Sequence, residues 1–362
     1  MKIEITIEKI KALTTKAYKG VSNNRLAPIT SLMGLEFSPE GLTIRTFDGE
    51  NHVVVRDASI KTEEPANITM NADMFKNLID KLTTKTVSLE IKDKYLEVIG
   101  NGTYKMEIVY DDNQVLVMKN IDNDLAKEGT IKNTVDRKVL QAALDYNEVS
   151  AAKTVEVLFE TGAYMGDEII TTDEVLATVT HQSLVKGSKF LFKYSTLHLI
   201  SVFEKDELEF LVNGKDFLFT DGVNSVRGTF LDGVEEYPSN EVLAWVTGNP
   251  DAKFVTVNTK DVVEALDRLS IFVTPYDNDR VDFEFRGKTL SIKSNQSKAV
   301  EVINAEAAQE ANDVLALSLT PLKLQLATIK KEKVNLYYSE AQSLRIGADG
   351  VDYLIATVDT GE

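Results

Sequence analysis

Three stretches of the chain share one pattern, in which apolar and polar residues alternate, pause at a short polar break and alternate again. They are KTVSLEIKDKYLEVIGNG (85–102), DELEFLVNGKDFLFTDG (206–222) and EKVNLYYSEAQSLRIGADG (332–350). Alternation with period 2 is typical of a strand that buries one face, and a polar break between two such runs is typical of a turn. The pattern therefore predicts three β-hairpins.

Each of these hairpins follows a strand-like run and then a helix-like run, at 67–85, 190–205 and 315–331. Aligning Val87 with Leu208 and Val334 gives shifts of 121 and 126 residues, by subtraction. Under these shifts further apolar positions coincide, namely Leu82 with Phe203 and Ile329, and Phe75 with Leu322. Such positions fall on one face of a helix. The alignment predicts a repeat in pattern, without identity of residues.

The first half of each unit repeats as well. Helix-like segments at 6–20, 134–149 and 258–272 open with Thr6, Thr134 and Asn258, residue types that cap helix N-termini. A predicted hairpin with a glycine in its turn follows each, at 35–49, 157–173 and 281–295, with Gly41, Gly166 and Gly287. Each unit therefore reads β-α-β-β-β twice. A single hairpin is commonplace, but three units in one order are a strong signal of repeated domains.

The sequence thus predicts an α+β fold of three repeated domains, each with two helices packed on antiparallel β-sheets. The predicted domains are 1–120, 130–247 and 251–362. The segments between them suit linkers, because 119–129 is polar and acidic and 247–251 contains the helix and strand breakers Gly and Pro.

Composition removes several classes of function. The chain has no Cys, which excludes disulfides and thiol chemistry, and its three His have no metal-binding spacing. It also lacks GxGxxG, GxxxxGK[ST] and GxSxG motifs. We therefore predict no enzyme, no cofactor and no metal. Without an apolar run of about 18 residues or a signal-peptide pattern, we expect a cytoplasmic protein with no membrane partner.

The formal net charge of −17 argues, as an average, against nucleic acid, since affinity for phosphate comes from Lys and Arg. The basic residues nevertheless gather on the helix-like segments. They include Lys9, Lys11, Lys16, Lys76, Lys81, Arg137, Lys138, Lys193, Lys205, Lys260, Arg268, Lys323 and Lys330. The alternative is an ordinary solvated helix surface. If the helices line an opening, these residues would contact phosphates weakly and without reading the bases.

At this point several motifs, in order along the repeat, resemble the bacterial-type β sliding clamp family, the DNA polymerase III beta subunits. They are MKIEITIEKI at the start, RLAPITSLMGLEF (25–37), LFET (158–161), TTD (171–173), Asp232-Gly233 with Tyr237-Pro238, and Tyr353-Leu354-Ile355. The resemblance covers nearly the whole chain. Its departures from the family pattern favour a divergent or phage-encoded member.

The resemblance implies a DNA sliding clamp, a polymerase processivity factor whose head-to-tail homodimer encircles double-stranded DNA with helices inside. It implies a DNA contact at Arg25 and a dimer interface that joins Met106 and Ile108 to Ile271 and Phe272. The alternative is a clamp-fold adaptor or structural subunit that no longer encircles DNA. An enzyme built on repeated α+β domains is a third reading, without a site to support it.

The resemblance also implies a groove for short peptide motifs of the replicative polymerase and the clamp loader. The matched positions are Thr172, Leu176, Ala177, Pro238, Val242, Leu243, Ser343, Leu354, Ala356 and Val358. The family usually continues TTD with a Gly-His-Arg-Leu-like run, where this chain has Glu174-Val175-Leu176-Ala177, and the two also differ at the C-terminus. We expect that an apolar groove persists and that its partner motif differs.

Overall fold

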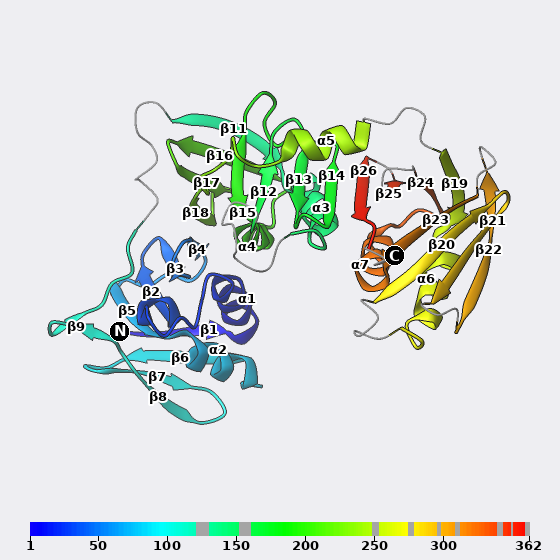
Figure 1. The fold of residues 1–362 in the computed structure, drawn as a ribbon. Coiled ribbons are helices and arrows are strands. Elements are labelled where there is room, and N and C mark those ends of the chain that lie inside the picture. Colours follow the sequence, from blue (N-terminus) through cyan, green and yellow to red (C-terminus); the bar gives the residue numbers. More distant parts are fainter. Residues whose placement is uncertain are drawn as a thin grey trace. The chain divides into compact units, whose positions relative to one another are not determined.

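The computed structural model describes residues 1–120, 130–151, 161–247, 253–273, 279–294, 298–307, 312–338, 343–348 and 350–358 (Figure 1). The predicted linkers lie largely outside these ranges. Within them the chain forms helices and antiparallel strands, as the sequence predicts.

The first repeat contains two similar halves. Its elements are β1 (Lys2–Thr6), α1 (Ile7–Tyr18), the 3-10 helix η1 (Pro28–Ser31), β2 (Leu32–Ser38), β3 (Gly41–Phe47), β4 (His52–Asp57), β5 (Ala66–Asn71), α2 (Ala72–Lys81), β6 (Thr86–Ile91), β7 (Tyr95–Ile99) and β8 (Thr103–Glu107). The short strands β9 (Tyr110–Asp111) and β10 (Gln114–Val115) follow. The predicted order of elements is confirmed.

The second repeat has the same order with a shorter second helix. Its elements are β11 (Ile131–Asp136), α3 (Arg137–Asn147), β12 (Gly162–Met165), β13 (Ile169–Thr172), β14 (Leu176–Thr180), β15 (Phe190–Lys193), α4 (Tyr194–Leu197), the 3-10 helix η3 (His198–Val202), β16 (Glu207–Asn213), β17 (Asp216–Thr220) and β18 (Ser225–Thr229). A further helix, α5 (Ser239–Thr247), follows it and has no counterpart in the predicted repeat.

The third repeat again follows the predicted order. Its elements are β19 (Lys253–Asn258), α6 (Thr259–Leu269), β20 (Arg280–Arg286), β21 (Thr289–Ser294), β22 (Val300–Ala307), β23 (Asn312–Ser318), α7 (Leu319–Thr328), β24 (Lys333–Tyr338), β25 (Ser343–Ala348) and β26 (Val351–Ala356). None of the helices described here is long and apolar enough to cross a membrane.

The register of the repeat is the same in all three units. The first strand pairs antiparallel with the first strand of the closing hairpin, and the three aligned residues meet equivalent partners: Ile5 faces Val87, Val135 faces Leu208, and Val257 faces Val334. The second aligned set also coincides in structure, because Leu82, Phe203 and Ile329 each occupy the C-cap of their helix. The two shifts read from the sequence are therefore confirmed.

The predicted helix caps are confirmed at one of three positions. The Asn258 side chain accepts hydrogen bonds from the backbone N–H groups of Lys260 and Asp261, as a capping residue does. Thr6 precedes α1 but makes no such bond. The prediction that Thr134 caps a helix is wrong, because this residue lies within β11 and the helix starts later. The Asp136 carboxylate instead accepts a 2.8 Å hydrogen bond from the Lys138 N–H.

The chain divides into two compact units. Unit 1 comprises Met1–Lys138 with Ser195–Phe230, and unit 2 comprises Val139–Tyr194 with Leu231–Glu362. Each unit contains a place where strands of two predicted repeats pair. In unit 1 this first joint is the pairing of β4 with β18, and in unit 2 the second joint is the pairing of β14 with β26. The domain boundaries read from the sequence stay a prediction.

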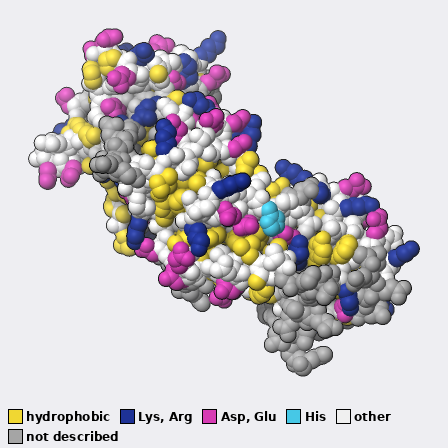
Figure 2. All heavy atoms as spheres, turned by 90° about the horizontal axis from the view of Figure 1, so that it is seen from above, with side chains coloured by type: hydrophobic (Ala, Val, Ile, Leu, Met, Phe, Trp, Pro, Cys, Tyr) yellow, Lys and Arg dark blue, Asp and Glu magenta, His cyan; other side chains and the backbone are white. Residues whose placement is uncertain are grey.

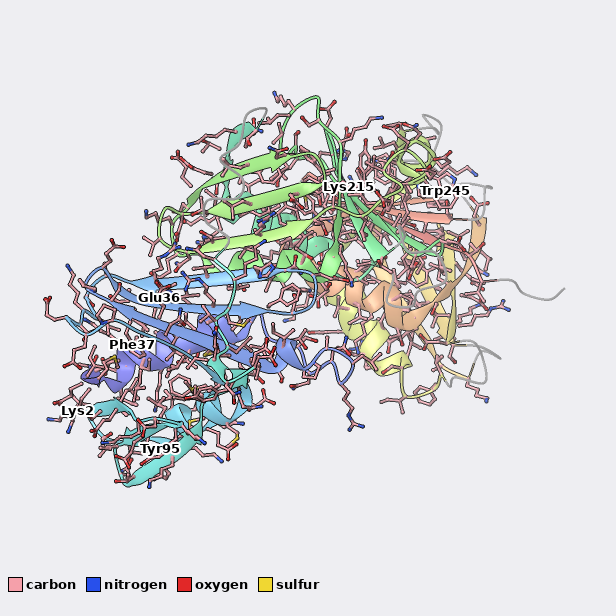
Figure 3. All side chains as sticks on the ribbon, turned by 90° about the vertical axis from the view of Figure 1, so that its left-hand side faces the viewer. Lys2, Glu36, Phe37, Tyr95, Lys215 and Trp245 are labelled. Carbon is pink, nitrogen blue, oxygen red and sulfur yellow. The ribbon has the colours of Figure 1, made fainter. Side chains whose placement is uncertain are left out.

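Sheets and helices form layers within each unit. Alternation places Phe37 of β2 in the core and leaves Glu36 partly exposed, where it pairs with Arg45 (Figure 3). In unit 1, α1 packs beside α2 and onto β3 and β4 (Figure 1). In unit 2, α6 packs beside α7, and Phe283, Phe285 and Tyr338 lie in the core that these helices cover.

Candidate functional site

A pocket of about 300 Å³ opens in unit 2 beside the second joint. It is lined by Thr172, Glu174, Glu236, Pro238, Glu241, Val242 and Trp245. Two segments build it: the turn between β13 and β14, and the segment that enters and forms α5, which packs on β14 and β26 (Figure 1).

Helix α5 supplies the apolar wall of the pocket. Residues four apart share a helix face, so Pro238 lies near Val242 and Glu241 near Trp245. Val242 is buried in an apolar cluster with Tyr237, Val246 and Leu354. Trp245, in contrast, is 53% exposed, an unusual state for the largest apolar side chain (Figure 3). The pocket therefore has a fixed apolar wall and an exposed aromatic edge.

The turn between β13 and β14 forms the opposite lip. The Asp173 carboxylate accepts hydrogen bonds from the N–H groups of Val175 (3.1 Å) and Leu176 (2.7 Å), and the Thr172 hydroxyl donates to the Leu176 carbonyl (2.8 Å). These bonds hold Glu174 in a left-handed conformation with φ +71°. A non-glycine residue rarely adopts that conformation, so the lip is rigid and mildly strained.

A buried polar network anchors this hairpin from below. The Ser150 hydroxyl lies 2.7 Å from the Thr171 hydroxyl and donates to the Thr178 hydroxyl at 2.6 Å. The Thr171 hydroxyl also bonds to the side chain of Asn147, at the end of α3. All four residues are fully buried. Satisfied buried networks fix a unique geometry, and here the network fixes both strands that carry the pocket lip.

The structure brings three of the predicted groove residues together, since Thr172, Pro238 and Val242 line the pocket. The others do not line it. Ala177 and Leu354 belong to the apolar cluster beneath, Leu243 packs against that cluster, and Leu176 joins the larger core of unit 2. Ser343, Ala356 and Val358 are partly exposed at or after the paired ends of β25 and β26. Their role in a groove stays a prediction.

Sequence reasoning missed Glu174, Glu236, Glu241 and Trp245, which complete the lining. One signal was available. Trp245 is the single tryptophan of the chain and follows Glu241 by one helical turn. The position of Glu174 could not be read from the sequence, because it depends on a turn whose geometry the two neighbouring side chains fix.

Half of the basic residues expected to face DNA, seven of fourteen, are paired with carboxylates within the chain. The pairs are Lys16 with Glu204, Lys76 with Asp80, Arg137 and Lys138 with Asp206, Lys260 with Glu264, Arg268 with Glu301, and Lys323 with Asp267. Hydrogen bonding lowers the pKa of two of these carboxyls, through Lys138 for Asp206 and through Arg268 for Glu301. On the face drawn in Figure 2, basic and acidic side chains are likewise interspersed.

Six of the seven remaining predicted cations fall into two groups. The first donates to neutral oxygens: Lys9 to the Ser59 hydroxyl, Lys11 to the Leu82 carbonyl and Lys205 to the Asp221 carbonyl. The second group is exposed and forms no ion pair with a described residue; it consists of Arg25, Lys81 and Lys330. Lys193 is partly exposed and has a contact of its own. That any of these residues contacts DNA stays a prediction.

The four predicted interface residues differ in exposure. Ile271 and Phe272, after α6, are exposed, whereas Met106 and Ile108 are buried in the chain itself. The strand that carries Met106, β8, pairs with β7 and ends its sheet among the described strands. Residues 300–304 of β22 likewise pair with β21 on one side alone. The structure thus offers two open strand edges near the predicted positions.

These features define a class of protein: a clamp fold of three α+β repeats, with continuous sheets across the joints and an apolar pocket beside one of them. The comparisons with known proteins agree. Residues 1–116 match the family described as DNA polymerase III beta subunit, N-terminal domain. The beta sliding clamp of Bacillus subtilis (strain 168) is 22% identical over 358 residues, which are 91% of this chain and 90% of that protein.

Solved structures agree in fold. A DNA polymerase III beta subunit from Thermotoga maritima has a TM-score of 0.84 at 15% identity, over 99% of both chains. One from Borrelia burgdorferi has a TM-score of 0.85 at 14% identity, over the full length of both. The predicted resemblance to the bacterial-type β sliding clamp family and the predicted fold are confirmed. That family consists of non-catalytic replication factors, in agreement with the prediction that the chain is no enzyme.

Proposed function

We propose that the chain is a DNA sliding clamp that acts in the cytoplasm as a head-to-tail homodimeric ring around duplex DNA. In this function it tethers the replicative polymerase and is loaded by a clamp loader, both of which dock short peptide segments in the pocket beside the second joint. The family resemblance supports the general function, and the strand edges support the ring.

The main support for the ring is a rule of strand pairing that both joints within the chain follow. At both joints, the fourth strand of one repeat pairs with the last strand of a neighbouring repeat: β4 with β18 and β14 with β26. The equivalent strands that remain are β8, which ends its sheet among the described strands, and β22, whose residues 300–304 pair with β21 alone while 305–307 also pair with β19. A second copy of the chain can satisfy the rule twice, with β8 of each copy on β22 of the other.

Exposed apolar side chains around one of these edges support the same proposal. Val302 on β22 is 64% exposed and Ile271 after α6 is 78% exposed, with Val300 and Phe272 beside them in sequence. Open edges and apolar patches are costly in water unless a partner covers them. Pairing β22 with another copy would cover this patch and complete both sheets.

Topological retention explains how a chain of net charge −17 can serve DNA. A closed ring need not bind phosphates tightly. Because many helix cations are already paired internally, contact with the duplex would rest on a few residues such as Arg25, Lys81 and Lys330, and would weaken as salt rises.

Native mass spectrometry tests the ring. We expect a mass of twice 40.2 kDa for the wild-type protein. The Val302→Asp variant places a charge on the β22 edge and should give monomers. Val314→Asp is the matched control, because Val314 is a similarly exposed valine on β23, away from both proposed edges. A wild-type monomer, or dimers of V302D as stable as those of wild type, would contradict the pairing.

Retention on DNA tests encirclement without a loader. The protein is incubated with a linear duplex whose biotinylated ends are then blocked with streptavidin. We expect blocked DNA to retain the ring and cleavage between the blocks to release it. Binding that does not depend on the blocks, or no retention by a stable dimer, would favour the alternative of an adaptor that no longer encircles DNA.

A further inference from the structure

The rim of the pocket carries three carboxylates around an apolar wall. Glu174, Glu236 and Glu241 line the pocket, are exposed, and form no ion pair with a described residue. They contribute a local charge of −3 to an opening whose wall is formed by Pro238, Val242 and Trp245. Among the described residues no acidic group is compact enough to hold a metal ion, so the carboxylates surround the opening without converging on one point.

One of these carboxylates, that of Glu174, can be compared with the equivalent position in the first repeat of the same chain. In the first repeat, β3 and β4 are joined by a turn in which Phe47 faces His52, and in the second repeat Thr172 faces Ala177 in the same way. Subtracting 125 places Glu174 on Gly49, which also has positive φ, at +108°. Glycine adopts such a conformation without strain. At the pocket, the chain has a glutamate where its own repeat has glycine.

We propose that the pocket selects partner segments that place a Lys or Arg side chain next to the apolar side chain that enters it. This inference rests on the proposed function of the pocket in partner docking and adds the chemistry of the partner. An apolar side chain would pack on Val242, Pro238 and Trp245. The neighbouring ammonium or guanidinium group would lie among the three carboxylates and within reach of the Trp245 ring.

Charge complementarity decides against the opposite occupant. A segment with Asp or Glu at the flanking positions would bring like charges to a rim that has no cation of its own among the lining residues. Repulsion of this kind gives specificity by excluding wrong partners. Because the rim is exposed, the selection should depend on salt.

Two synthetic peptides that differ in one residue test the proposal: Gln-Leu-Lys-Leu-Phe and Gln-Leu-Glu-Leu-Phe. Trp245 is the single tryptophan of the chain and lines the pocket, so its fluorescence reports binding at this place. We expect the Lys peptide to bind at least about fivefold more tightly, and the ratio to shrink between about 50 and about 300 mM salt.

Variants locate the effect. Glu236→Gln combined with Glu241→Gln, and separately Glu174→Gly, should bring the affinity ratio of the two peptides toward one. The control is Glu235→Gln, which removes one glutamate charge from the same segment, at a residue that pairs with Lys189 and does not line the pocket. It should leave the ratio unchanged.

The outcomes separate the inference from the proposed function. If both peptides bind wild-type protein equally, or the Glu peptide binds more tightly, selection for a cation is wrong and peptide docking stands. If neither peptide changes the Trp245 signal or binds by calorimetry, docking in this pocket is wrong and the inference fails with it. If Glu235→Gln brings the affinity ratio of the two peptides toward one as strongly as the rim variants do, the preference comes from the overall charge of the protein and the inference is wrong.

Discussion

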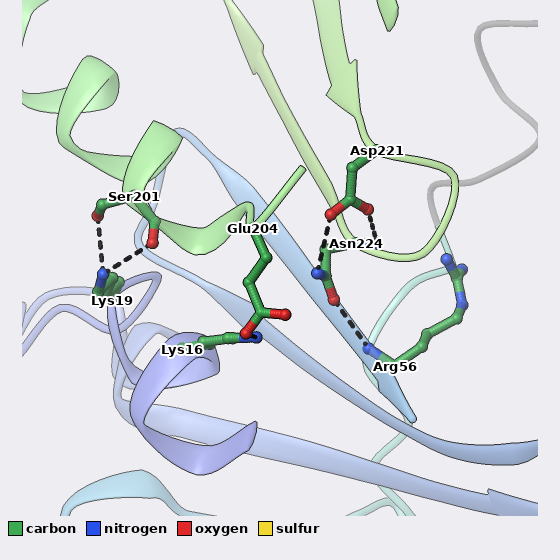
Figure 4. Close-up of polar contacts among 7 residues, drawn as sticks. All are labelled: Lys16, Lys19, Arg56, Ser201, Glu204, Asp221 and Asn224. Atoms are coloured by element: carbon green, nitrogen blue, oxygen red, sulfur yellow. Dashed lines mark hydrogen bonds and ion pairs between the residues drawn. The ribbon is translucent and has the colours of Figure 1, made fainter. Parts of the chain in front are cut away.

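The two joints have the same strand pairing and different surroundings. At the first joint, polar groups hold the edge: the Arg56 N–H donates to the Asn224 side chain (3.2 Å) and the Arg56 guanidinium donates to the Val223 carbonyl (2.9 Å). Beside it, Lys16 and Lys19 of the α1 region contact Glu204 and Ser201 (Figure 4).

At the second joint an apolar cluster around Leu354 and Val242 takes that place, and α5 adds a wall that leaves a pocket. The difference lies mainly in the connecting segment. After the first repeat the chain forms the small β9 and β10 pair, whereas after the second it forms α5. One repeated framework therefore serves as a polar seam in one place and as a candidate docking site in another.

The largest expected effect on stability comes from a substitution in the apolar cluster at the second joint. Leu354 is almost fully buried in the cluster at the second joint, so Leu354→Ala should cost about 2–5 kcal/mol of the free energy of unfolding by leaving a cavity. Urea unfolding followed by Trp245 fluorescence measures it. Leu324→Ala, at a half-exposed leucine of α7, is the control and should cost far less. Equal losses would show that the cluster does not hold the joint.

A smaller effect concerns the ions of the second joint. The Asp352 carboxylate is buried on β26 and bonds to the Arg345 guanidinium (2.8 Å) and the His181 ring (2.7 Å). Asp352→Asn should cost about 1–3 kcal/mol of stability, because Arg345 loses its anionic partner.

The first joint supplies the comparison for this ion pair. Asp216 pairs with Arg227 but is more than a third exposed, so Asp216→Asn should cost less than about 1 kcal/mol. Denaturant midpoints of both variants measure the difference. A larger loss of stability for Asp216→Asn than for Asp352→Asn would contradict the prediction that the buried ion pair contributes more than the exposed one.

The polar seam of the first joint gives the next effect. Asn224 is buried, accepts from the Arg56 N–H and donates to Asp221 (3.3 Å), so Asn224→Ala should cost about 1–2 kcal/mol. Hydrogen exchange at the Arg56 amide would report the loss locally. Asn77→Ala, at an exposed position of α2, is the matched control and should leave that exchange rate unchanged.

The smallest effect is a pH dependence at the first joint. His52 stacks on Phe47 with ring centroids 4.3 Å apart, and burial, followed by the charges of Arg227 and Lys119, lowers its pKa despite the opposing effect of Asp48. The folded state thus favours the neutral ring, and the unfolded state binds more protons. Stability contributed here is complete above about pH 6.5 and is lost as the pH falls through the lower folded pKa.

Substitution isolates this contribution from the many carboxyls that titrate in acid. His52→Phe keeps an aromatic ring against Phe47 and cannot be protonated. Urea midpoints at pH 7.5 and 5.5 should therefore fall less for this variant than for wild type. The same fall in both proteins would mean that His52 does not contribute to the pH dependence.

The sequence by itself determined the repeat and its register. Alternation around Val87, Leu208 and Val334 is local, because each strand must bury every second residue, and the same local rule fixes the helix faces. For that reason the order of elements and the C-cap positions of Leu82, Phe203 and Ile329 could be read from the pattern. Helix starts were less certain, as Thr134 shows, because several neighbouring polar residues can cap.

Tertiary structure decided the rest. Which strand edges meet across repeats, which lysines are neutralised by distant carboxylates such as Glu204, and which residues complete the pocket all depend on segments far apart in the chain. Glu174 and Trp245 are 71 positions apart by subtraction and line one pocket because β14, β26 and α5 pack together. Local patterns do not predict these long-range contacts, because they indicate which face of an element is buried but not which segment covers it.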